Sequence, residues 1–175
     1  MVTRIPYPRT PATIVELEAV AEANPGWKVE LEADGSLTMS PAFTVSGLHD
    51  AALYELMIAW KARAGGKLFA SSTGFTMPDG AILSPDASWI SAERWAAVTI
   101  EQRMTYTSIV PDICIEIASK TDRILRLTQK LHRYRDFGAS YVLLIDPWKR
   151  TTWSDGERPA DFPPDFSSVF DAILS

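Results

Sequence analysis

PDICIEIASKTDRILRLTQKLHRYRDFGASYVLLID (residues 111–146) is the stretch that decides the fold. It opens with an apolar run after Pro111, continues with a helical pattern that ends at Gly138, and closes with a second, almost entirely apolar run. A strand, a helix and a strand in this order form a crossover unit, which normally places its two strands parallel in one sheet. The stretch therefore predicts an α/β fold.

The rest of the chain adds helices and hairpins to this unit. Thr10 and Pro11 indicate the start of a first helix that ends before Gly26. Asp34 and Gly35 supply a tight turn between strands at residues 28–32 and 36–39. A long helix starting at Ser46 should bury Leu48, Ala52, Leu56 and Ala59 and end at the Gly65-Gly66 pair.

Turn signals divide the middle of the chain into short elements. We expect strands at residues 67–71, 74–77 and 82–90, and helical turns at 93–98 and 100–103. Hairpins are antiparallel and the crossover is parallel, so the sheet should be mixed and flanked by helices. We expect one domain, residues 1–175, with an N-terminal helical segment (1–26) and a C-terminal strap without regular structure (158–175).

Composition restricts the class of protein. The net charge of −5 argues against broad, non-specific coating of nucleic acid, so any nucleic-acid site must be local. The single cysteine, Cys114, excludes an internal disulfide and cysteine-based zinc sites. No apolar run approaches the length of a membrane span and no signal peptide is apparent, so we expect a cytoplasmic protein without a membrane segment.

Two carboxylates and one lysine stand out. Asp86 and Glu116 lie within strand-like apolar runs, where a buried charge must be paired, protonated or bound to a metal. Lys130 lies on the following helix, roughly 80° from the centre of its apolar stripe, so its stem can follow the sheet toward a strand end. Such a set suits metal-assisted phosphodiester hydrolysis. A structural ion pair and a solvated lysine are the alternatives.

Several stretches together resemble the Uma2 family, formerly a domain of unknown function, of the restriction-endonuclease-like PD-(D/E)xK superfamily. They are SSTGF (71–75), SPDASW (84–89), PDICIEI (111–117), SKTDR (119–123), the helix with Lys130 and Tyr134, and LIDP (144–147). The likeness runs from about residue 27 to about residue 153. It implies a mixed sheet flanked by helices.

The resemblance also implies a metal site. Asp86, Glu116 and a main-chain carbonyl near Ile117 would hold Mg²⁺ or Mn²⁺, and Lys130 would orient the attacking water or offset developing charge. The superfamily usually places its lysine two residues after the glutamate, where this chain has Ala118. In Uma2-like sequences the lysine lies on the following helix, and Lys130 matches that position.

Weaker candidates surround this set. Glu30 matches an acidic residue that the family carries before its hairpin, and it would complete the metal shell through a water; otherwise it is an outward-facing strand residue. His49 stands where relatives often show histidine, with proton transfer or phosphate contact as its role; otherwise it is a partly buried histidine near a helix start. Asp112 lies about 13 Å from Glu116 along its strand, so we expect it to cap a turn or strand.

A basic segment supplies the local nucleic-acid contacts. Six of the seventeen Lys and Arg residues lie between Lys120 and Arg135. Of these, Lys120 and Arg123 are candidate contacts to DNA phosphates, and the alternative is a helix with a charged outer face.

These observations predict a divalent-metal-dependent DNA endonuclease. The alternatives are a cleavage-inactive nuclease-fold module that binds nucleic acid or protein, and a hydrolase of another phosphoester. Six tryptophans and an aromatic tail indicate a homodimer or a higher homo-oligomer.

Overall fold

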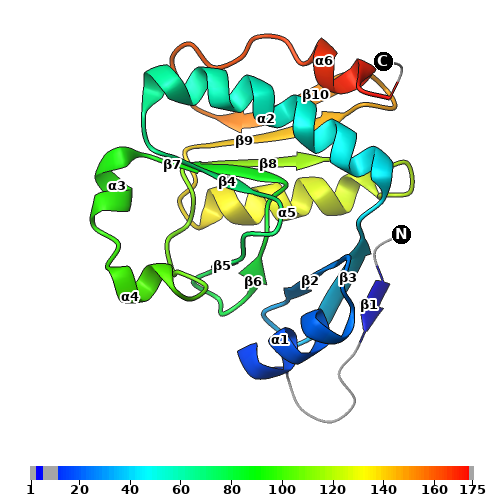
Figure 1. The fold of residues 1–175 in the computed structure, drawn as a ribbon, viewed down its shortest axis with the longest axis vertical. Helices are drawn as coiled ribbons and strands as arrows, with labels where there is room; N and C mark the ends of the chain where they lie inside the picture. The colour runs from blue at the N-terminus through cyan, green and yellow to red at the C-terminus, as the bar shows by residue number, and fades with distance from the viewer. Residues whose placement is uncertain (1–2, 6–11, 174–175) are drawn as a thin grey trace.

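The computed structural model, which describes residues 3–5 and 12–173, consists of two five-stranded sheets and the helices that flank them (Figure 1). The strands are β1 (Thr3–Ile5), β2 (Trp27–Leu31), β3 (Leu37–Pro41), β4 (Lys67–Ala70), β5 (Phe75–Thr76), β6 (Ile82–Leu83), β7 (Ala87–Ile90), β8 (Ile113–Ile117), β9 (Tyr141–Asp146) and β10 (Thr151–Gly156). The helices are α1 (Ile14–Ala23), α2 (Thr44–Ala64), α3 (Ala92–Ala96), α4 (Ile100–Arg103), α5 (Ile124–Asp136) and α6 (Ser167–Asp171).

The crossover unit forms as the sequence predicts. Strands β8 and β9 are parallel, with Ile113 opposite Tyr141, and α5 connects them. Their sheet has the order β10-β9-β8-β7-β4, and its other neighbouring pairs are antiparallel. The sheet is therefore mixed, and the expected α/β class is confirmed.

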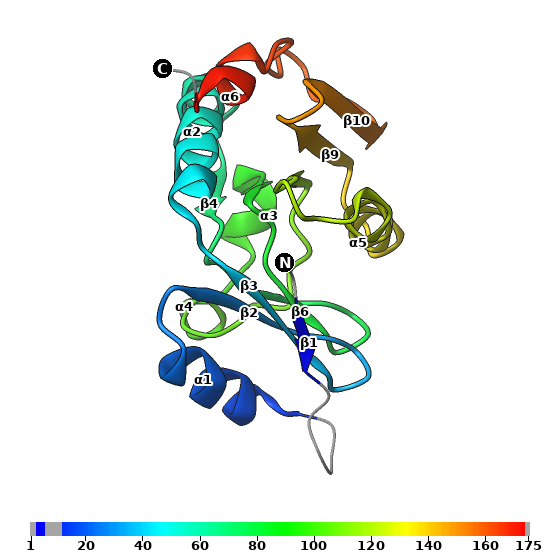
Figure 2. The same ribbon diagram turned by 90° about the vertical axis from the view of Figure 1, so that its right-hand side faces the viewer.

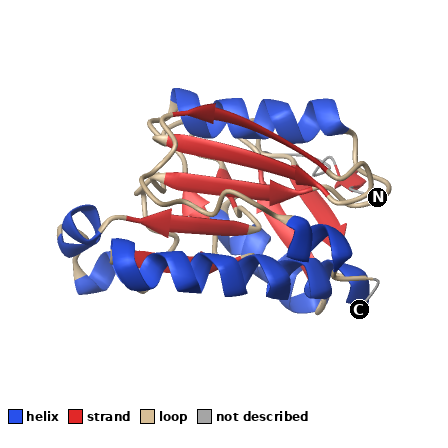
Figure 3. Cartoon of the chain, turned by 90° about the horizontal axis from the view of Figure 1, so that it is seen from above, coloured by secondary structure: helices blue, strands red, loops and turns tan. Residues whose placement is uncertain are grey.

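This second sheet lies between helices on its two faces (Figure 3). Ile113 and Ile115 of β8 pack in a cluster with Leu53, Met57 and other side chains of α2. The alternate residue Cys114 packs with Leu131 and further α5 side chains on the opposite face. Glu116 has the same parity as Cys114, so it faces α5.

The first sheet has the order β1-β3-β2-β6-β5 and forms a smaller lobe with α1 (Figure 2). Its hairpin pairs Leu31 with Leu37, around the predicted Asp34-Gly35 turn. The predicted cap at Thr10 lies outside the described residues. The first helix begins at Ile14, and the Thr13 N–H donates to Glu16 Oε2 at 2.9 Å, which satisfies one free amide of the first turn.

The single strand predicted at residues 82–90 is wrong. The structure divides it into β6 and β7, which belong to different sheets. Pro85 has no N–H to donate, so a regular ladder does not continue through it. Asp86, just before β7, instead lies where the chain crosses from one sheet to the other, and its N–H donates to Ile115 O at 2.9 Å.

The predicted face of the second helix is partly wrong: Ala52 and Leu56 pack against the core, but Leu48 and Ala59 are exposed. The helix begins at Thr44 instead of Ser46, and it buries His49, Leu53, Met57 and Trp60. Leu48, which was expected in the core, is 47% exposed. Apolar side chains occur on adjacent faces of this helix, so the position of the sheet decides which face is buried.

The C-terminal segment packs on the α2 side of the second sheet. Phe162, Phe166 and Val169 are buried there, and Trp60 Nε1 donates to Ala160 O at 3.1 Å. The segment was expected to have no regular structure, but it contains α6, which starts after the prolines. Within residues 3–5 and 12–173, no helix has both the length and the apolar character that crossing a membrane requires.

Candidate active site

A largely enclosed lysine, whose side chain is 13% exposed, joins two glutamates from different sheets. Lys130 Nζ from α5 lies 2.8 Å from Glu116 Oε1 of β8 and 2.8 Å from Glu30 Oε1 of β2. It also donates to Ser84 O at 3.1 Å. The Ser84 N–H in turn donates to Glu30 Oε1 at 2.6 Å. Lys130 is therefore held by one strand of each sheet and by the segment that connects the two sheets.

Asp86 and Lys28 complete a cluster of five charged residues, which are Lys28, Glu30, Asp86, Glu116 and Lys130. Asp86 Oδ1 lies 2.9 Å from Lys28 Nζ of β2, and Asp86 Oδ2 accepts a hydrogen bond from the Ile117 N–H at 2.8 Å. Ile117 directly follows Glu116, so this hydrogen bond brings the two carboxylates to the same end of β8. Ile117 was expected to contribute its carbonyl, and the contact that the structure shows is made by its N–H.

Burial and charge shift the pKa values of the two glutamates in opposite directions. Burial raises the pKa of Glu116 to about 7, although the ammonium of Lys130 favours its ionised form. Burial also disfavours the charge on Glu30, but Lys130 and Lys28 outweigh it and lower the Glu30 pKa below its ordinary value. Near neutral pH, Glu116 therefore exchanges a proton readily while Glu30 remains ionised.

The two lysines remain protonated. Burial opposes their charge, yet the surrounding carboxylates outweigh burial and raise the pKa of Lys28 and of Lys130. The cluster holds three carboxyl groups and two ammonium groups, and Glu116 gains its negative charge as the pH rises through its pKa of about 7. The excess negative charge favours a cation.

Further hydrogen bonds hold the backbone at Asp86, where the chain passes from the first sheet to the second. The Tyr54 hydroxyl of α2 donates to Asp86 O at 2.7 Å and accepts from the Ser71 N–H at 2.7 Å. Ser71 Oγ donates to Asp50 Oδ2 at 3.1 Å. Burial and the nearby charge of Asp86 raise the pKa of Asp50 to about 6. These contacts connect α2 to the backbone that carries Asp86.

Glu30 faces inward and is 7% exposed, so the outward-facing alternative is wrong. Lys28 is a member of the cluster that the sequence analysis missed. Lys28 and Glu30 are two residues apart on β2, and side chains at this spacing share one face of a strand. The alternation of charged and apolar residues in KVEL (28–31) is the signal that could have indicated both.

Three predicted residues lie outside the cluster. His49 is buried against Trp148, with ring centroids 6.0 Å apart, and burial lowers its pKa. Its Nε2 has no hydrogen-bond partner among the residues that the structure describes. Lys120 and Arg123 are exposed, and within the described ranges neither forms an ion pair with a carboxylate. Lys120 Nζ lies 6.0 Å from the centroid of the Trp148 ring.

Asp112 has a structural role, as expected. It accepts a hydrogen bond from the Ser91 N–H at 2.8 Å and pairs with Arg94. Its main-chain carbonyl accepts from the N–H groups of Ser140 and Tyr141. It therefore fixes the start of β8 against β9 and α3.

The cluster can accept a divalent cation only through a small set of protein ligands. Across residues 3–5 and 12–173, no three His, Cys, Asp or Glu side chains are grouped as a metal site. Mg²⁺ commonly uses one or two carboxylates and fills its shell with water and substrate oxygens. Although Glu116 Oε1 lies 2.8 Å from Lys130 Nζ, this buried oxygen accepts no properly oriented hydrogen bond within the described residues. An under-satisfied carboxylate oxygen beside Asp86 suits such a cation.

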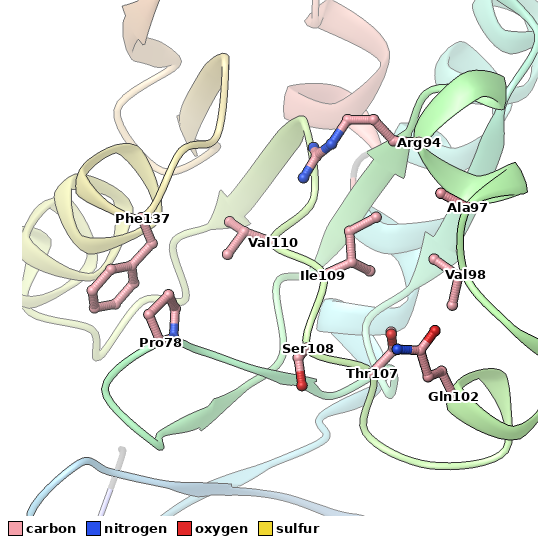
Figure 4. Close-up of a pocket in the computed structure, with 10 residues that line it drawn as sticks. All are labelled: Pro78, Arg94, Ala97, Val98, Gln102, Thr107, Ser108, Ile109, Val110 and Phe137. Atoms are coloured by element: carbon pink, nitrogen blue, oxygen red, sulfur yellow. The ribbon is translucent and has the colours of Figure 1, made fainter.

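A cavity lies away from the cluster (Figure 4). It has a volume of about 480 Å³ and is lined by Arg94, Val98, Gln102, Ile109 and Phe137 among others. None of the cluster residues lines it. Its arginine is already paired with Asp112, so the cavity offers less chemistry than the carboxylates, and we assign the candidate site to the cluster.

Comparisons with known proteins identify the family of the chain and a solved structure of similar fold. The model of the Uma2 family, described as "Putative restriction endonuclease", matches residues 13–154. No curated protein matches the chain. Among solved structures, the crystal structure of "a putative nuclease belonging to DUF820" from Anabaena variabilis ATCC 29413 is similar, with a TM-score of 0.61 and 18% sequence identity. The similarity covers 83% of this chain and 91% of that chain.

Proposed function

The chain belongs to the Uma2 family and has the restriction-endonuclease-like fold that its sequence predicted, and from this premise we propose that it is a divalent-metal-dependent DNA endonuclease. The observation that carries the proposal is the meeting of Asp86 and Glu116 with Lys130 at the junction of the two sheets. Family membership supports nuclease activity in general. The metal, the DNA substrate and the residue roles are the proposal.

Asp86 and Glu116 would bind Mg²⁺ or Mn²⁺, and the ion would polarise the scissile phosphate and acidify a bound water. The Ile117 N–H holds Asp86 Oδ2, which leaves Oδ1 to face a cation. Hard carboxylate oxygens favour these ions over zinc. Glu116, with a pKa of about 7, would lose its proton on binding the ion near neutral pH.

Lys130 would orient the attacking water or offset the negative charge that develops on the phosphate. Glu30 and Ser84 O hold its ammonium beside Glu116, so the lysine is positioned before any substrate arrives. We assign Glu30 this positioning role in addition to a contact to the ion through water. Since a positioned group needs no reorganisation during the reaction, this arrangement suits catalysis.

The geometry is also consistent with the absence of a lysine at position 118. Ala118 is buried in the core cluster that includes α5 side chains, on the same face of β8 as Glu116. Lys130 reaches that face from α5 and places its ammonium 2.8 Å from the glutamate. The helix thus supplies the charge that the superfamily usually takes from the strand.

A second candidate is a cleavage-inactive module that binds nucleic acid or protein. Lys28 and Lys130 both contact the carboxylates directly, and paired charges of this kind also occur as structural networks. A hydrolase of another phosphoester would use the same chemistry. The exposed Lys120 and Arg123 support a DNA substrate, because neither is paired within the described ranges.

We also propose that the protein associates with itself. Trp27 is 43% exposed and Phe43 is 52% exposed, and exposed aromatic side chains are typical of interfaces. A homodimer would also suit cleavage of both strands. Sedimentation equilibrium distinguishes a monomer from a dimer.

Cleavage of plasmid DNA at low salt tests the function. The wild type should cut with Mg²⁺ or Mn²⁺ and remain inactive in EDTA, while Glu116→Gln and Lys130→Met should lose activity by at least about a hundredfold. The matched controls are Glu55→Gln and Lys67→Met, which change exposed residues of α2 and β4 and should cut normally. Activity that survives in Glu116→Gln would refute the metal site, and a wild type that binds DNA without cutting it would favour the binding module.

A further inference from the structure

We propose that Lys28 is a built-in competitor of the metal ion: its ammonium occupies the Asp86 carboxylate and must be displaced when a divalent cation binds. The inference rests on the proposed function, because it concerns the same site. It gives a role to the one cluster residue that the proposed mechanism leaves without a task.

The contacts of the two lysines differ. Lys130 Nζ has three oxygen partners, Glu30 Oε1, Glu116 Oε1 and Ser84 O. Lys28 Nζ has one oxygen partner among the described residues, Asp86 Oδ1 at 2.9 Å. Its side chain is 20% exposed, compared with 13% for Lys130. Lys28 is therefore the cation that can leave the cluster at the lower cost.

The position of Lys28 places it in direct competition with a metal ion. Asp86 Oδ2 accepts the Ile117 N–H, and Oδ1, the Asp86 oxygen that faces a cation, is the one that Lys28 contacts. Asp86 and Glu116 both attract the Lys28 ammonium, and they are also the proposed metal ligands. An ammonium and a divalent ion cannot share this oxygen without strong repulsion.

Two consequences follow from this arrangement. Without metal, Lys28 offsets the charge of the carboxylates and keeps Asp86 in place. With metal, the displacement of Lys28 reduces the net binding free energy, so the protein needs a higher concentration of free divalent cation than the carboxylates alone would require. Removing the ammonium should therefore tighten metal binding, although it removes a native ion pair.

Mn²⁺ binding without substrate tests this inference, and electron paramagnetic resonance of free Mn²⁺ at pH 8 reports it directly. Lys28→Met should bind Mn²⁺ at least about tenfold more tightly than the wild type, because a neutral side chain does not repel the ion. Lys28→Arg keeps the positive charge, and the arginine can donate two N–H hydrogen bonds to the carboxylate. This variant should therefore bind Mn²⁺ no more tightly than the wild type. Lys67→Met, on the exposed face of β4, is the matched control and should not change binding.

Each outcome is decisive. Unchanged or weaker binding in Lys28→Met overturns the inference, and so does equal tightening in Lys28→Arg. Binding that Glu116→Gln abolishes but Lys28→Met leaves unchanged would overturn the inference alone and leave the proposed metal site intact. An absence of Mn²⁺ binding in the wild type and in every variant would overturn both. Circular dichroism checks that the variants are folded, and Lys28→Gln provides a second neutral variant if Lys28→Met does not fold.

Discussion

Replacing Glu116 with glutamine should remove a large part of the pH dependence of stability. Glu116 is 3% exposed, and its pKa of about 7 lies above the ordinary value of 4.5. A carboxyl group whose pKa is raised on folding binds its proton more tightly in the native state. Its contribution is thus full below pH 4.5 and is lost as the pH rises through about 7. Glutamine has no proton to lose, so the variant should lack this decline.

The two pKa values give the size of the effect. One pH unit corresponds to about 1.4 kcal/mol, so ionising Glu116 in the folded protein costs about 3 kcal/mol in total. About 2 kcal/mol of this loss should fall between pH 5.5 and pH 8.5. Glu30 does not add to the decline, because its lowered pKa places its own titration below this range. Asp50 and His49 titrate in both proteins, so their contributions cancel in the comparison.

Urea unfolding followed by tryptophan fluorescence measures the effect. The free energy of unfolding is determined in metal-free buffer at several pH values for the wild type, Glu116→Gln and the surface control Glu55→Gln. The slope of stability against pH is compared instead of the absolute value, because glutamine also changes packing and hydrogen bonding at this site in ways that do not depend on the protonation of residue 116. Equal slopes in the wild type and Glu116→Gln would refute the conclusion that burial raises the pKa of this glutamate.

Further substitutions separate catalytic from structural roles. Lys130→Met leaves Glu30 and Glu116 without their shared cation, so we expect it to lower the free energy of unfolding by about 3–5 kcal/mol at pH 8 and by less at pH 5, as urea titrations at the two pH values would show. Addition of Mg²⁺ at pH 8 should raise the melting temperature of the wild type but not that of Glu116→Gln, which differential scanning calorimetry can measure. Asp112→Asn weakens the contacts to Ser91 and Arg94, so it should cost about 1–3 kcal/mol in urea unfolding while leaving Mn²⁺ affinity unchanged, because Asp112 lies at the opposite end of β8. Met57→Ala removes a fully buried side chain, and calorimetry should show a loss of about 2–5 kcal/mol.

Local sequence patterns were sufficient to predict the crossover unit. The apolar runs of β8 and β9 and the amphipathic helix between them are each encoded within a short stretch, and a helix that connects two strands of one sheet normally places them parallel. The same patterns indicated Glu116, a charge in an apolar strand, whereas the choice of Lys130 depended on the resemblance to the Uma2 family. Strand β10 was not predicted, because TTWSDG (151–156) is polar and mostly exposed and gains its order from pairing with β9.

Contacts between segments that are distant in the sequence could be identified only from the tertiary structure. The strand predicted through Pro85 is divided between two sheets, and this division carries Asp86 to the Ile117 N–H. The buried face of α2 is decided by the sheet beneath it, because apolar residues are present on more than one face. Neither outcome is encoded in the local periodicity of these segments.

The sequence by itself determined the α/β class, the crossover unit and the residue types that a metal-dependent nuclease would need. Only the tertiary structure showed that Lys28, which was not among the sequence candidates, joins Glu30 of the first sheet and Glu116 of the second in one cluster. The physical reason is that a local pattern specifies the type of element and, where the apolar residues lie on a single face, the side that becomes buried, whereas the packing of whole sheets decides which charged side chains meet. The Lys28–Asp86 contact joins residues 58 positions apart, so no short window of sequence contains it.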